Sequence, residues 1–336
     1  MTETLKKPLA LTIGEPAGIG PEIALRAWQT ASKTGVPAFV LIGDFATMAD
    51  EGARLDVPVE QIDCSSAAEN CFSRALPVLD VPFAERAVAG KPASGTAGGV
   101  IKSIDRAVEL TLSGETRAVV TNPIQKSALN SAGFQQPGHT EYLAQLSHQA
   151  GHNATPVMML ANGKLRAVPI TVHMALADVP KKLTSELIAE TARVTHADLS
   201  SRFGIAAPRL AFAGLNPHAG EAGMMGKEDA AVIEPAVNLL RSEGIDALGP
   251  LPADTMFHDE ARENYDVAMC MYHDQALIPV KTLGFHDGVN VTLGLPFVRT
   301  SPDHGTALSL ARTGKARPDS LIAALQLADR LSGAES

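Results

Sequence analysis

YDVAMCMYHDQALIPVKTLGFHDGVNVTLGLPFVR, residues Tyr265–Arg299, is the stretch that decides the fold. It begins with an apolar run, Val267–Met271, whose length and boundaries are typical of a buried β-strand. His273, Asp274 and Gln275 follow directly, so polar side chains stand where this strand ends. Polar groups beside a core need hydrogen-bonding partners. The stretch therefore predicts a polar site at the end of a buried strand.

More polar groups follow within the same stretch. Lys281 and Arg299 are cations, and Asn290 lies in a second short β-like run. Together with His273 and Asp274, they suggest a site for an anionic ligand and a metal ion. For each residue taken alone, the alternative is a satisfied structural network in which Lys281 and Arg299 are solvated.

Composition limits the class of protein. The chain has 336 residues, of which 45% are hydrophobic, so it can form two domains or one large α/β unit. Its net charge of −9 disfavours nonspecific binding to nucleic acid or an anionic membrane. Cys64, Cys71 and Cys270 have no paired metal-binding spacing, and no apolar segment approaches the ~20 residues of a membrane span. We therefore expect a cytoplasmic protein.

The first predicted strand leads into a glycine-rich turn. Leu9–Ile13 is apolar, Gly14–Glu22 follows, and Pro21 suits the first turn of a helix that extends to Trp28. The order of strand, turn and helix resembles a phosphate-binding entry, but the spacing matches neither GxGxxG nor the Walker pattern. A tight turn without a ligand is an equal alternative.

Strands and helices alternate along the chain, which predicts an α/β fold with a mainly parallel sheet. Asn162-Gly163 predicts a hairpin turn, and residues 65–88 show no regular pattern. Further strands are predicted at Phe39–Ile42, Ala118–Val120, Pro156–Leu160, Leu165–Val172 and Leu210–Ala213, and helices at Gly95–Leu112, Ser185–Phe203, Gly226–Glu243 and from Asp303 to Leu331.

The sequence Gly138–Glu141 precedes a helical pattern, Tyr142–His148. Thr140 is a candidate N-cap, and the backbone N–H groups there could bind an anion. In the alternative interpretation Thr140 only caps the helix and His139 is a surface residue.

Three histidines share one sequence context. His173, His218 and His273 each follow an apolar, strand-like run, at separations of 45 and 55 residues. Loops after strands collect ligands in α/β folds, and three imidazoles suit a divalent transition metal. A hydrolase would use the ion to activate water, whereas a hydroxy-acid dehydrogenase would use it to hold the substrate oxygens. A phosphate-binding protein without catalysis is a third class.

Several blocks of the chain resemble those of 4-hydroxythreonine-4-phosphate dehydrogenases: GEPAGIGPE (14–22), GHTE (138–141), GLNPHAGE (214–221), GPLPADT (249–255), YHDQ (272–275), GVNVTLGLPFVRTSPDHGTA (288–307) and GKA (314–316). GIGPE and HGTA…GKA also resemble elements of isopropylmalate and isocitrate dehydrogenases. That resemblance implies their two-domain fold, with the active site in the interdomain cleft. Residues 1–140 with 295–336 would form the cofactor-side domain, and residues 141–294 the metal, substrate and dimerisation domain.

The resemblance also implies the reaction. NAD or NADP would oxidise 4-phosphooxy-L-threonine at C3, and decarboxylation would give 3-amino-2-oxopropyl phosphate, on the route to pyridoxal phosphate. It implies a homodimer with its active site at the interface. The implied metal ligands are His173, His218 and His273, with the last supplied by the partner subunit; zinc is expected, with magnesium or cobalt as alternatives.

A base must take the hydroxyl proton in such a reaction, and the candidates are Lys281, Asp274 and Asp254; Lys281 is equally a candidate for a fixed cation that binds phosphate or carboxylate. The binding residues follow from the resemblance. Substrate binding is assigned to His139, Thr140, Lys281, Asn290 and Arg299, and cofactor binding to Asp303, His304, Gly305 and Thr306.

One block departs from the family pattern. The family has Thr-His-Leu-Pro-Leu where this chain has Val172–Leu176, reading VHMAL. The histidine is kept while its neighbours change, so a sister activity on a sugar-acid phosphate, such as threonate or erythronate 4-phosphate, is an alternative.

Overall fold

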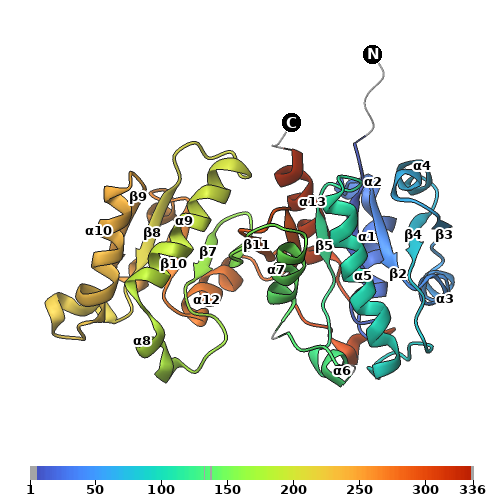
Figure 1. Ribbon diagram of the computed structural model, residues 1–336, viewed down its shortest axis with the longest axis horizontal. Helices are drawn as coiled ribbons and strands as arrows, with labels where there is room; N and C mark the ends of the chain where they lie inside the picture. The colour runs from blue at the N-terminus through green and yellow to red at the C-terminus, as the bar shows by residue number, and fades with distance from the viewer. Residues whose placement is uncertain (1–5, 132, 137, 334–336) are drawn as a thin grey trace, which may run out of the picture. The chain divides into compact units, whose positions relative to one another are not determined.

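The computed structural model describes residues 6–131, 133–136 and 138–333. The chain forms two compact units (Figure 1). The first comprises the chain up to Ala154 together with Leu295–Gly333, and the second comprises Thr155–Gly294. The expected boundary after residue 140 would cut helix α7 (His139–Gln149), which lies whole in the first unit. The roles assigned to the two domains stay predictions.

The described residues of the first unit form strands in the order β3-β4-β2-β1-β5-β12, and every neighbouring pair is parallel. Its strands are β1 (Leu9–Thr12), β2 (Phe39–Gly43), β3 (Val59–Ile62), β4 (Leu76–Asp80), β5 (Val119–Thr121) and β12 (Arg299–Pro302). Its helices are α1 (Gly20–Gln29), α2 (Ala31–Thr34), α3 (Phe45–Leu55), α4 (Ala68–Phe72), α5 (Ser94–Leu112), α6 (Lys126–Ser131), α7 and α13 (Asp319–Gly333).

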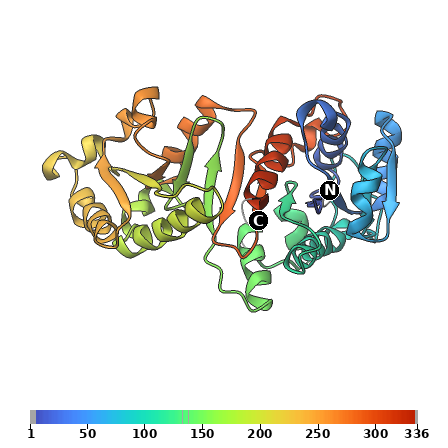
Figure 2. The same ribbon diagram turned by 90° about the horizontal axis from the view of Figure 1, so that it is seen from above.

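Both faces of this sheet are covered. Figure 2 shows α1 and α13 on one side of the sheet and α5 on the other. The central strands β1 and β2 are therefore buried along their whole length, which explains why their sequences are almost continuously apolar. The carboxyl ends of the parallel strands meet at one edge of the sheet.

Two sequence expectations in this unit are wrong. Residues 65–88 were expected to be irregular, but they contain α4 and β4. Strand β4 includes Pro77, which weakens its sequence signal, yet its burial between β2 and β3 stabilises it. Residues 303–318 were expected to be helical, but α13 begins only at Asp319. A loop with a short 3₁₀ turn, Leu308–Leu310, precedes it.

The second unit contains the strand order β11-β6-β7-β10-β8-β9. Pairs β11–β6 and β6–β7 are antiparallel, and the others are parallel. Its strands are β6 (Val157–Ala161), β7 (Arg166–Pro169), β8 (Arg209–Ala213), β9 (Asp246–Leu251), β10 (Val267–Cys270) and β11 (Val289–Leu293). Its helices are α8 (Val179–Lys182), α9 (Ser185–Ser201), a π-helical turn (Asp229–Ile233), α10 (Glu234–Ser242), α11 (Asp259–Arg262) and α12 (His273–Leu283).

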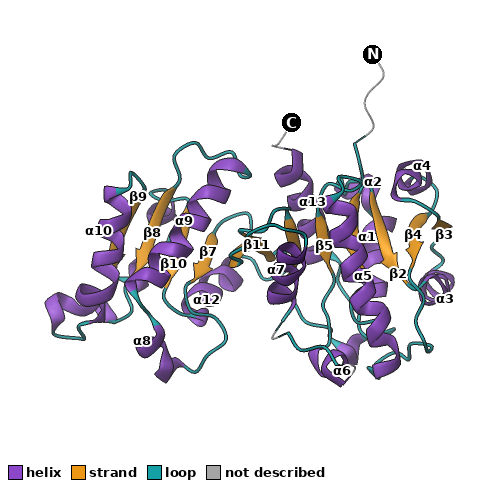
Figure 3. Ribbon diagram, in the orientation of Figure 1, coloured by secondary structure: helices purple, strands orange, loops and turns teal. Residues whose placement is uncertain are grey.

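The predicted hairpin at Asn162-Gly163 is confirmed. It joins β6 to β7, and the Asn162 Oδ1 atom accepts hydrogen bonds from the backbone N–H groups of Lys164 and Leu165. The alternation of helices and strands in Figure 3 and the parallel pairings confirm the α/β class with a mainly parallel sheet. Among the described residues, no helix combines the length and apolar character needed to span a bilayer.

Candidate functional site

The glycine-rich turn after β1 is bonded within the first unit. The backbone N–H of Glu15 donates to the Pro123 carbonyl (2.8 Å), and that of Ile19 donates to the Thr306 carbonyl (3.0 Å). Gly14 has a φ of +69°, and a Cβ there would lie 2.6 Å from the Pro123 oxygen, so only glycine fits. Because these N–H groups already have partners in the chain, they are not available to a phosphate. This favours the structural interpretation of the turn.

Two buried polar residues near this turn were not selected from the sequence. Glu15 is buried, which raises the pKa of its carboxyl, and its Oε1 accepts a hydrogen bond from the Ala17 N–H at 2.9 Å. Asn122 follows β5; its Nδ2 donates to the Thr12 carbonyl, and its buried Oδ1 has no partner among the described residues. The available signal was the polar sequence Thr121-Asn122-Pro123 at a strand end.

Arg299 gives the first unit a buried cation, and His139 lies close to it. Arg299 is 4% exposed, and its Nη2 donates to the Thr121 Oγ1 atom at 2.7 Å. Burial lowers the pKa of Arg299 to about 10, so the guanidinium stays charged at neutral pH. Burial and the nearby Arg299 charge hold the pKa of His139 well below its usual range, so that imidazole is neutral. The His139 Nε2 atom is buried and has no partner among the described residues, as expected of a group that contacts a ligand.

Thr140 does not cap α7. The helix begins one residue earlier, at His139, and its N-cap is Gly138 in an extended conformation (φ −168°). Thr140 therefore lies in the first turn of the helix, and its expected role in substrate binding stays a prediction.

The residues expected to bind the cofactor lie in the loop before α13. The Asp303 N–H donates to the Ser320 Oγ atom (3.0 Å), and the Thr306 hydroxyl donates to the Gln125 Oε1 atom (3.1 Å). The His304 Nδ1 atom donates to the Gly305 carbonyl (2.9 Å), while its Nε2 is buried without a partner among the described residues. The loop is thus fixed at both ends and holds a polar atom that a ligand could satisfy.

Two of the three predicted metal ligands lie together in the second unit. His173 follows β7 and His273 follows β10, which are neighbouring parallel strands, and their ring centroids are 5.7 Å apart. Two imidazoles that share a tetrahedral ion place their ring centroids roughly 5–6 Å apart. Both rings border a cavity of about 450 Å³ that is also lined by Met174, Leu176 and Tyr272. The pair therefore fits a transition-metal ion.

The hydrogen bond between His273 and Asp274 prepares His273 to bind a metal. The His273 Nδ1 atom lies 2.8 Å from the Asp274 Oδ1 atom. Because a carboxylate only accepts, the Nδ1–H donates and the Nε2 is left with its lone pair for a metal.

His218 is not gathered with that pair. It begins a left-handed turn in which residues 218–222 have φ values between 42° and 81°. In the part of the chain that the structure describes, no group of three His, Cys, Asp or Glu side chains is placed to hold one ion. The assignment of three histidine ligands stays a prediction.

The turn that contains His218 is held by Asp229. The buried Asp229 carboxylate accepts hydrogen bonds from the backbone N–H groups of Leu215 (2.8 Å) and Asn216 (3.2 Å) and from the Asn216 Nδ2 atom (2.8 Å). These bonds fix the chain just before His218. Sequence reasoning did not select Asp229, because only the folded chain brings it to this loop.

The other predicted residues of the second unit lie at separate positions. Lys281 lies on α12 with His273, borders a wide cavity of about 520 Å³ with His273 and Asp274, and has its Nζ 5.8 Å from the Phe285 ring centroid. Asp254 is exposed in the turn Ala253–Thr255. The Asn290 Oδ1 atom, on β11, is buried without a partner among the described residues.

Proteins of known name resemble this chain over nearly its whole length. A 4-hydroxythreonine-4-phosphate dehydrogenase of Methylorubrum extorquens is 57% identical over 97% of this chain and 95% of that protein. The protein of the same name from Bradyrhizobium diazoefficiens is 52% identical and covers 100% of both chains.

Solved structures agree with these relatives. A crystal structure of 4-hydroxythreonine-4-phosphate dehydrogenase from Klebsiella pneumoniae has a TM-score of 0.87 and 37% identity, covering 97% of this chain and 100% of that one. A terephthalate 1,2-cis-dihydrodioldehydrogenase from Burkholderia xenovorans LB400 has a TM-score of 0.65 and 28% identity, covering 97% and 98%. Because the family model described as "Pyridoxal phosphate biosynthetic protein PdxA" also matches residues 36–328, this chain belongs to the PdxA family.

Proposed function

We propose that this protein is an NAD- or NADP-dependent and divalent-metal-dependent dehydrogenase of 4-phosphooxy-L-threonine. It oxidises the C3 hydroxyl, and the keto acid then loses carbon dioxide to give 3-amino-2-oxopropyl phosphate, a step in pyridoxal phosphate biosynthesis. The observation that carries the proposal is the identity of 57% over 97% of the chain to a protein of that name. The protein acts in the cytoplasm.

Arg299 and His139 of the first unit bind the anionic substrate, with further residues from the second unit. The buried Arg299 guanidinium attracts a phosphate or carboxylate, because an anion restores the stabilisation that the cation loses when it leaves water. Neutral His139 adds a hydrogen bond through its buried Nε2 without adding charge. Thr140, Lys281 and Asn290 complete the proposed set. The buried Asn290 Oδ1 atom accepts a hydrogen bond from a donor group of the substrate.

His173, His218 and His273 would hold a divalent ion, most suitably zinc, which supplies Lewis-acid chemistry while nicotinamide accepts hydride. Asp274 orients the His273 ring through its Nδ1–H. Among the described residues, one chain brings His173 and His273 together and leaves His218 apart, so we infer a homodimer in which the partner subunit completes the set through His218 rather than through the expected His273. The loop Asp303–Thr306 binds the dinucleotide.

The three candidate bases differ in their surroundings. Asp274 already accepts a hydrogen bond from His273, which assigns it to orientation of that ring. Asp254 is exposed. Lys281 lies about two helical turns after His273 on α12 and borders the cavity of about 520 Å³ together with His273 and Asp274. We infer that Lys281 is either the base or a fixed cation for the substrate, and Lys281→Met and Asp254→Asn separate these roles by their pH–rate profiles.

The direct test is reduction of NAD and of NADP with 4-phosphooxy-L-threonine, with and without added zinc. Zinc content of His173→Ala, His218→Ala and His273→Ala, measured by mass spectrometry, gives a readout that does not depend on activity. We expect each substitution to lower both zinc content and rate. Full zinc content in all three variants would show that the ligand assignment is wrong.

The second candidate is oxidation of threonate or erythronate 4-phosphate. The sequence Val172–Leu176 differs from the family pattern, and Met174 and Leu176 line the cavity beside His173. A change at this wall can alter which C2 substituent is accepted. Comparing kcat/KM for 4-phosphooxy-L-threonine with that for threonate 4-phosphate decides between the two substrates.

A further inference from the structure

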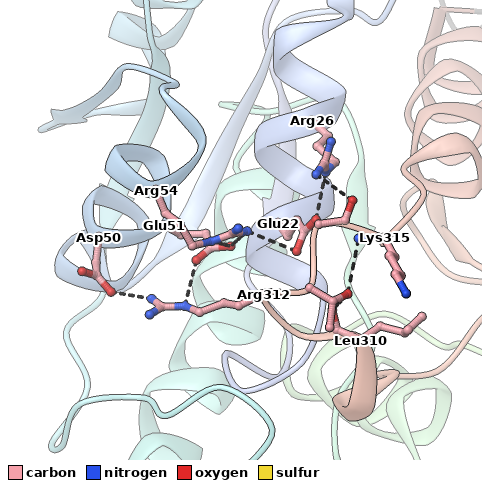
Figure 4. Close-up of polar contacts among 10 residues, drawn as sticks. Glu22, Arg26, Asp50, Glu51, Arg54, Leu310, Arg312 and Lys315 are labelled. Carbon is pink, nitrogen blue, oxygen red and sulfur yellow. Dashed lines mark hydrogen bonds and ion pairs between the residues drawn. The ribbon is translucent and has the colours of Figure 1, made fainter.

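A cluster of ion pairs in the first unit ties the loop before α13 to helices α1 and α3 (Figure 4). Two of its carboxylates are buried: Glu22 is 1% exposed and Glu51 is 3% exposed. Arg54 bridges them, with its Nη2 3.2 Å from a Glu22 oxygen and 2.6 Å from Glu51 Oε1. Arg26 contacts the other Glu22 oxygen at 2.9 Å.

Arg312 supplies a further cation, and it comes from the loop. Its Nε lies 3.0 Å from Glu51 Oε2, so the two oxygens of Glu51 contact two different guanidiniums. The Arg312 Nη2 also contacts Asp50. A buried carboxylate is costly unless each oxygen is bonded, so the buried Glu51 strongly favours the loop position that brings Arg312 to it.

The backbone of Arg312 shows that this position is imposed. Arg312 has a φ of +58° and Ala307 a φ of +43°, which are left-handed values that residues with a Cβ rarely adopt. Such backbone persists only where surrounding contacts determine it. The contacts of the Arg312 side chain with Asp50 and Glu51 are of this kind.

Arg312 lies six residues after Thr306, near the far end of residues 303–315, a segment whose first four residues are the ones proposed to bind the dinucleotide. The near end is held by the bond from the Ile19 N–H to the Thr306 carbonyl. The far end is held by Arg312 and by a bond from Arg26 Nη2 to the Gly314 carbonyl (3.1 Å). Both of the arginines that hold the far end, Arg26 and Arg312, are members of the same cluster of ion pairs.

We propose that Arg312 is a positioning residue for dinucleotide binding: its bonds to Glu51 and Asp50 hold residues 303–315 in the shape that receives the cofactor. This inference rests on the proposed function. Arg312 acts through the loop rather than by contact with the reacting atoms. The proposal therefore predicts that substitution of Arg312 lowers the affinity for the cofactor more than it lowers the rate of the chemical step.

The test uses the full-length protein and three variants. Arg312→Ala removes the ion pairs and keeps the left-handed strain, whereas Arg312→Gly removes the ion pairs and relieves the strain. Arg312→Lys keeps one charge but loses the planar fork. The matched control is Arg74→Ala, which removes an exposed two-bonded pair with Glu60 elsewhere in the same unit.

Titration of NADH and NADPH fluorescence gives the dissociation constants, and amide hydrogen exchange of residues 303–315 reports the loop directly. We expect Arg312→Ala to raise the dissociation constant of the preferred dinucleotide about tenfold, Arg312→Gly somewhat less, and Arg312→Lys least. At saturating dinucleotide, kcat should stay within about twofold. Exchange in the loop should accelerate in the same order, and Arg74→Ala should match the wild type.

Two results would overturn the proposal. One is a wild-type dissociation constant for the dinucleotide in Arg312→Gly, which would show that the loop keeps its conformation without the Arg312 side chain. The other is unchanged loop exchange in Arg312→Ala. If the wild-type protein binds neither dinucleotide, the proposed function is wrong, and loop exchange still decides by itself whether Arg312 holds the loop.

Discussion

Two loops of this protein adopt left-handed backbone at residues other than glycine, and buried carboxylates hold both. In the second unit, the His218 turn (residues 214–226) is held by Asp229. In the first unit, the Arg312 loop (residues 303–315) is held through Glu51. Asp229 accepts from neutral backbone and amide N–H groups, whereas Glu51 pairs with charged guanidiniums.

The difference shows two ways to stabilise an unfavourable backbone. Backbone N–H groups are fixed in direction, so the Asp229 bonds specify the local chain path and depend little on salt. Guanidiniums lie on long side chains that can reach across elements, so the Arg312 bonds connect distant parts of the unit. Partly exposed ion pairs of that kind are weakened by salt.

The largest effect should come from removing the buried acceptor of the His218 turn. Asp229→Ala leaves the backbone N–H groups of Leu215 and Asn216 without their acceptor, while the Asn216 amide keeps its bond to Glu228, and we expect it to lower the free energy of unfolding by about 3 kcal/mol or more. Asp229→Asn, which keeps one acceptor oxygen, should cost less. Urea unfolding measures both.

The control for Asp229 is Asp178→Ala, which removes an exposed pair with Lys181. It should change the free energy of unfolding by less than about 0.5 kcal/mol. A loss below about 1 kcal/mol in Asp229→Ala would mean that the turn keeps its shape without the carboxylate.

The strain of the two loops can be relieved separately. Ala222 is exposed in the His218 turn with a φ of +54°, so Ala222→Gly removes strain and no ion pair. We expect it to raise the free energy of unfolding by up to about 1 kcal/mol, since a left-handed Cβ costs more than the extra entropy of glycine. Thermal or urea unfolding tests this prediction. If Ala222→Gly lowered the free energy of unfolding, the claim that Ala222 is strained would be wrong.

Salt should separate the two loops. The Arg312–Asp50 pair is partly exposed, with 43% and 38% of the side chains accessible. Raising the ionic strength from about 0.05 to 1 M should weaken it by less than about 1 kcal/mol. Amide exchange should therefore accelerate in residues 303–315 more than in residues 214–226. Equal acceleration in both loops would contradict the contrast drawn between them.

The smallest effect concerns acid. The hydrogen bond from Arg312 is the main cause that lowers the pKa of Asp50, with the charges of Arg312 and Arg86 adding to it. A carboxyl with a lowered folded pKa stabilises the fold above its unfolded pKa of about 3.9 and loses that contribution as the pH falls through the folded value. After correction for intrinsic exchange rates, the Arg312 loop should thus exchange at a constant rate from about pH 5 to 8 and open below about pH 4. If the corrected exchange rate of the loop changed between about pH 6 and 8, protonation of Asp50 would not be the cause of loop opening.

The sequence predicted the elements whose signal is local. Central strands such as β1, β2 and β10 are short apolar runs because helices cover both faces of their sheets, and the Asn162-Gly163 hairpin follows from turn chemistry. Strand β4 was missed because Pro77 interrupts its apolar pattern, and its pairing with β2 and β3 in the sheet stabilises it.

The candidate site divides in the same manner. Strand ends are visible in the sequence, so it indicated that His173 and His273 follow strands, and their proximity follows from the neighbouring positions of β7 and β10. The long shared blocks indicated the PdxA family for the same reason: they are local.

Only the tertiary structure revealed which side chains hold the loops. In the sequence, Asp229 lies more than ten residues after the N–H groups from which it accepts hydrogen bonds. Arg312 is separated from Glu51 by most of the first unit's sequence. Nothing in the local pattern distinguishes these residues from ordinary surface charges. Their roles arise because burial makes each carboxylate depend on the partner that the fold brings to it.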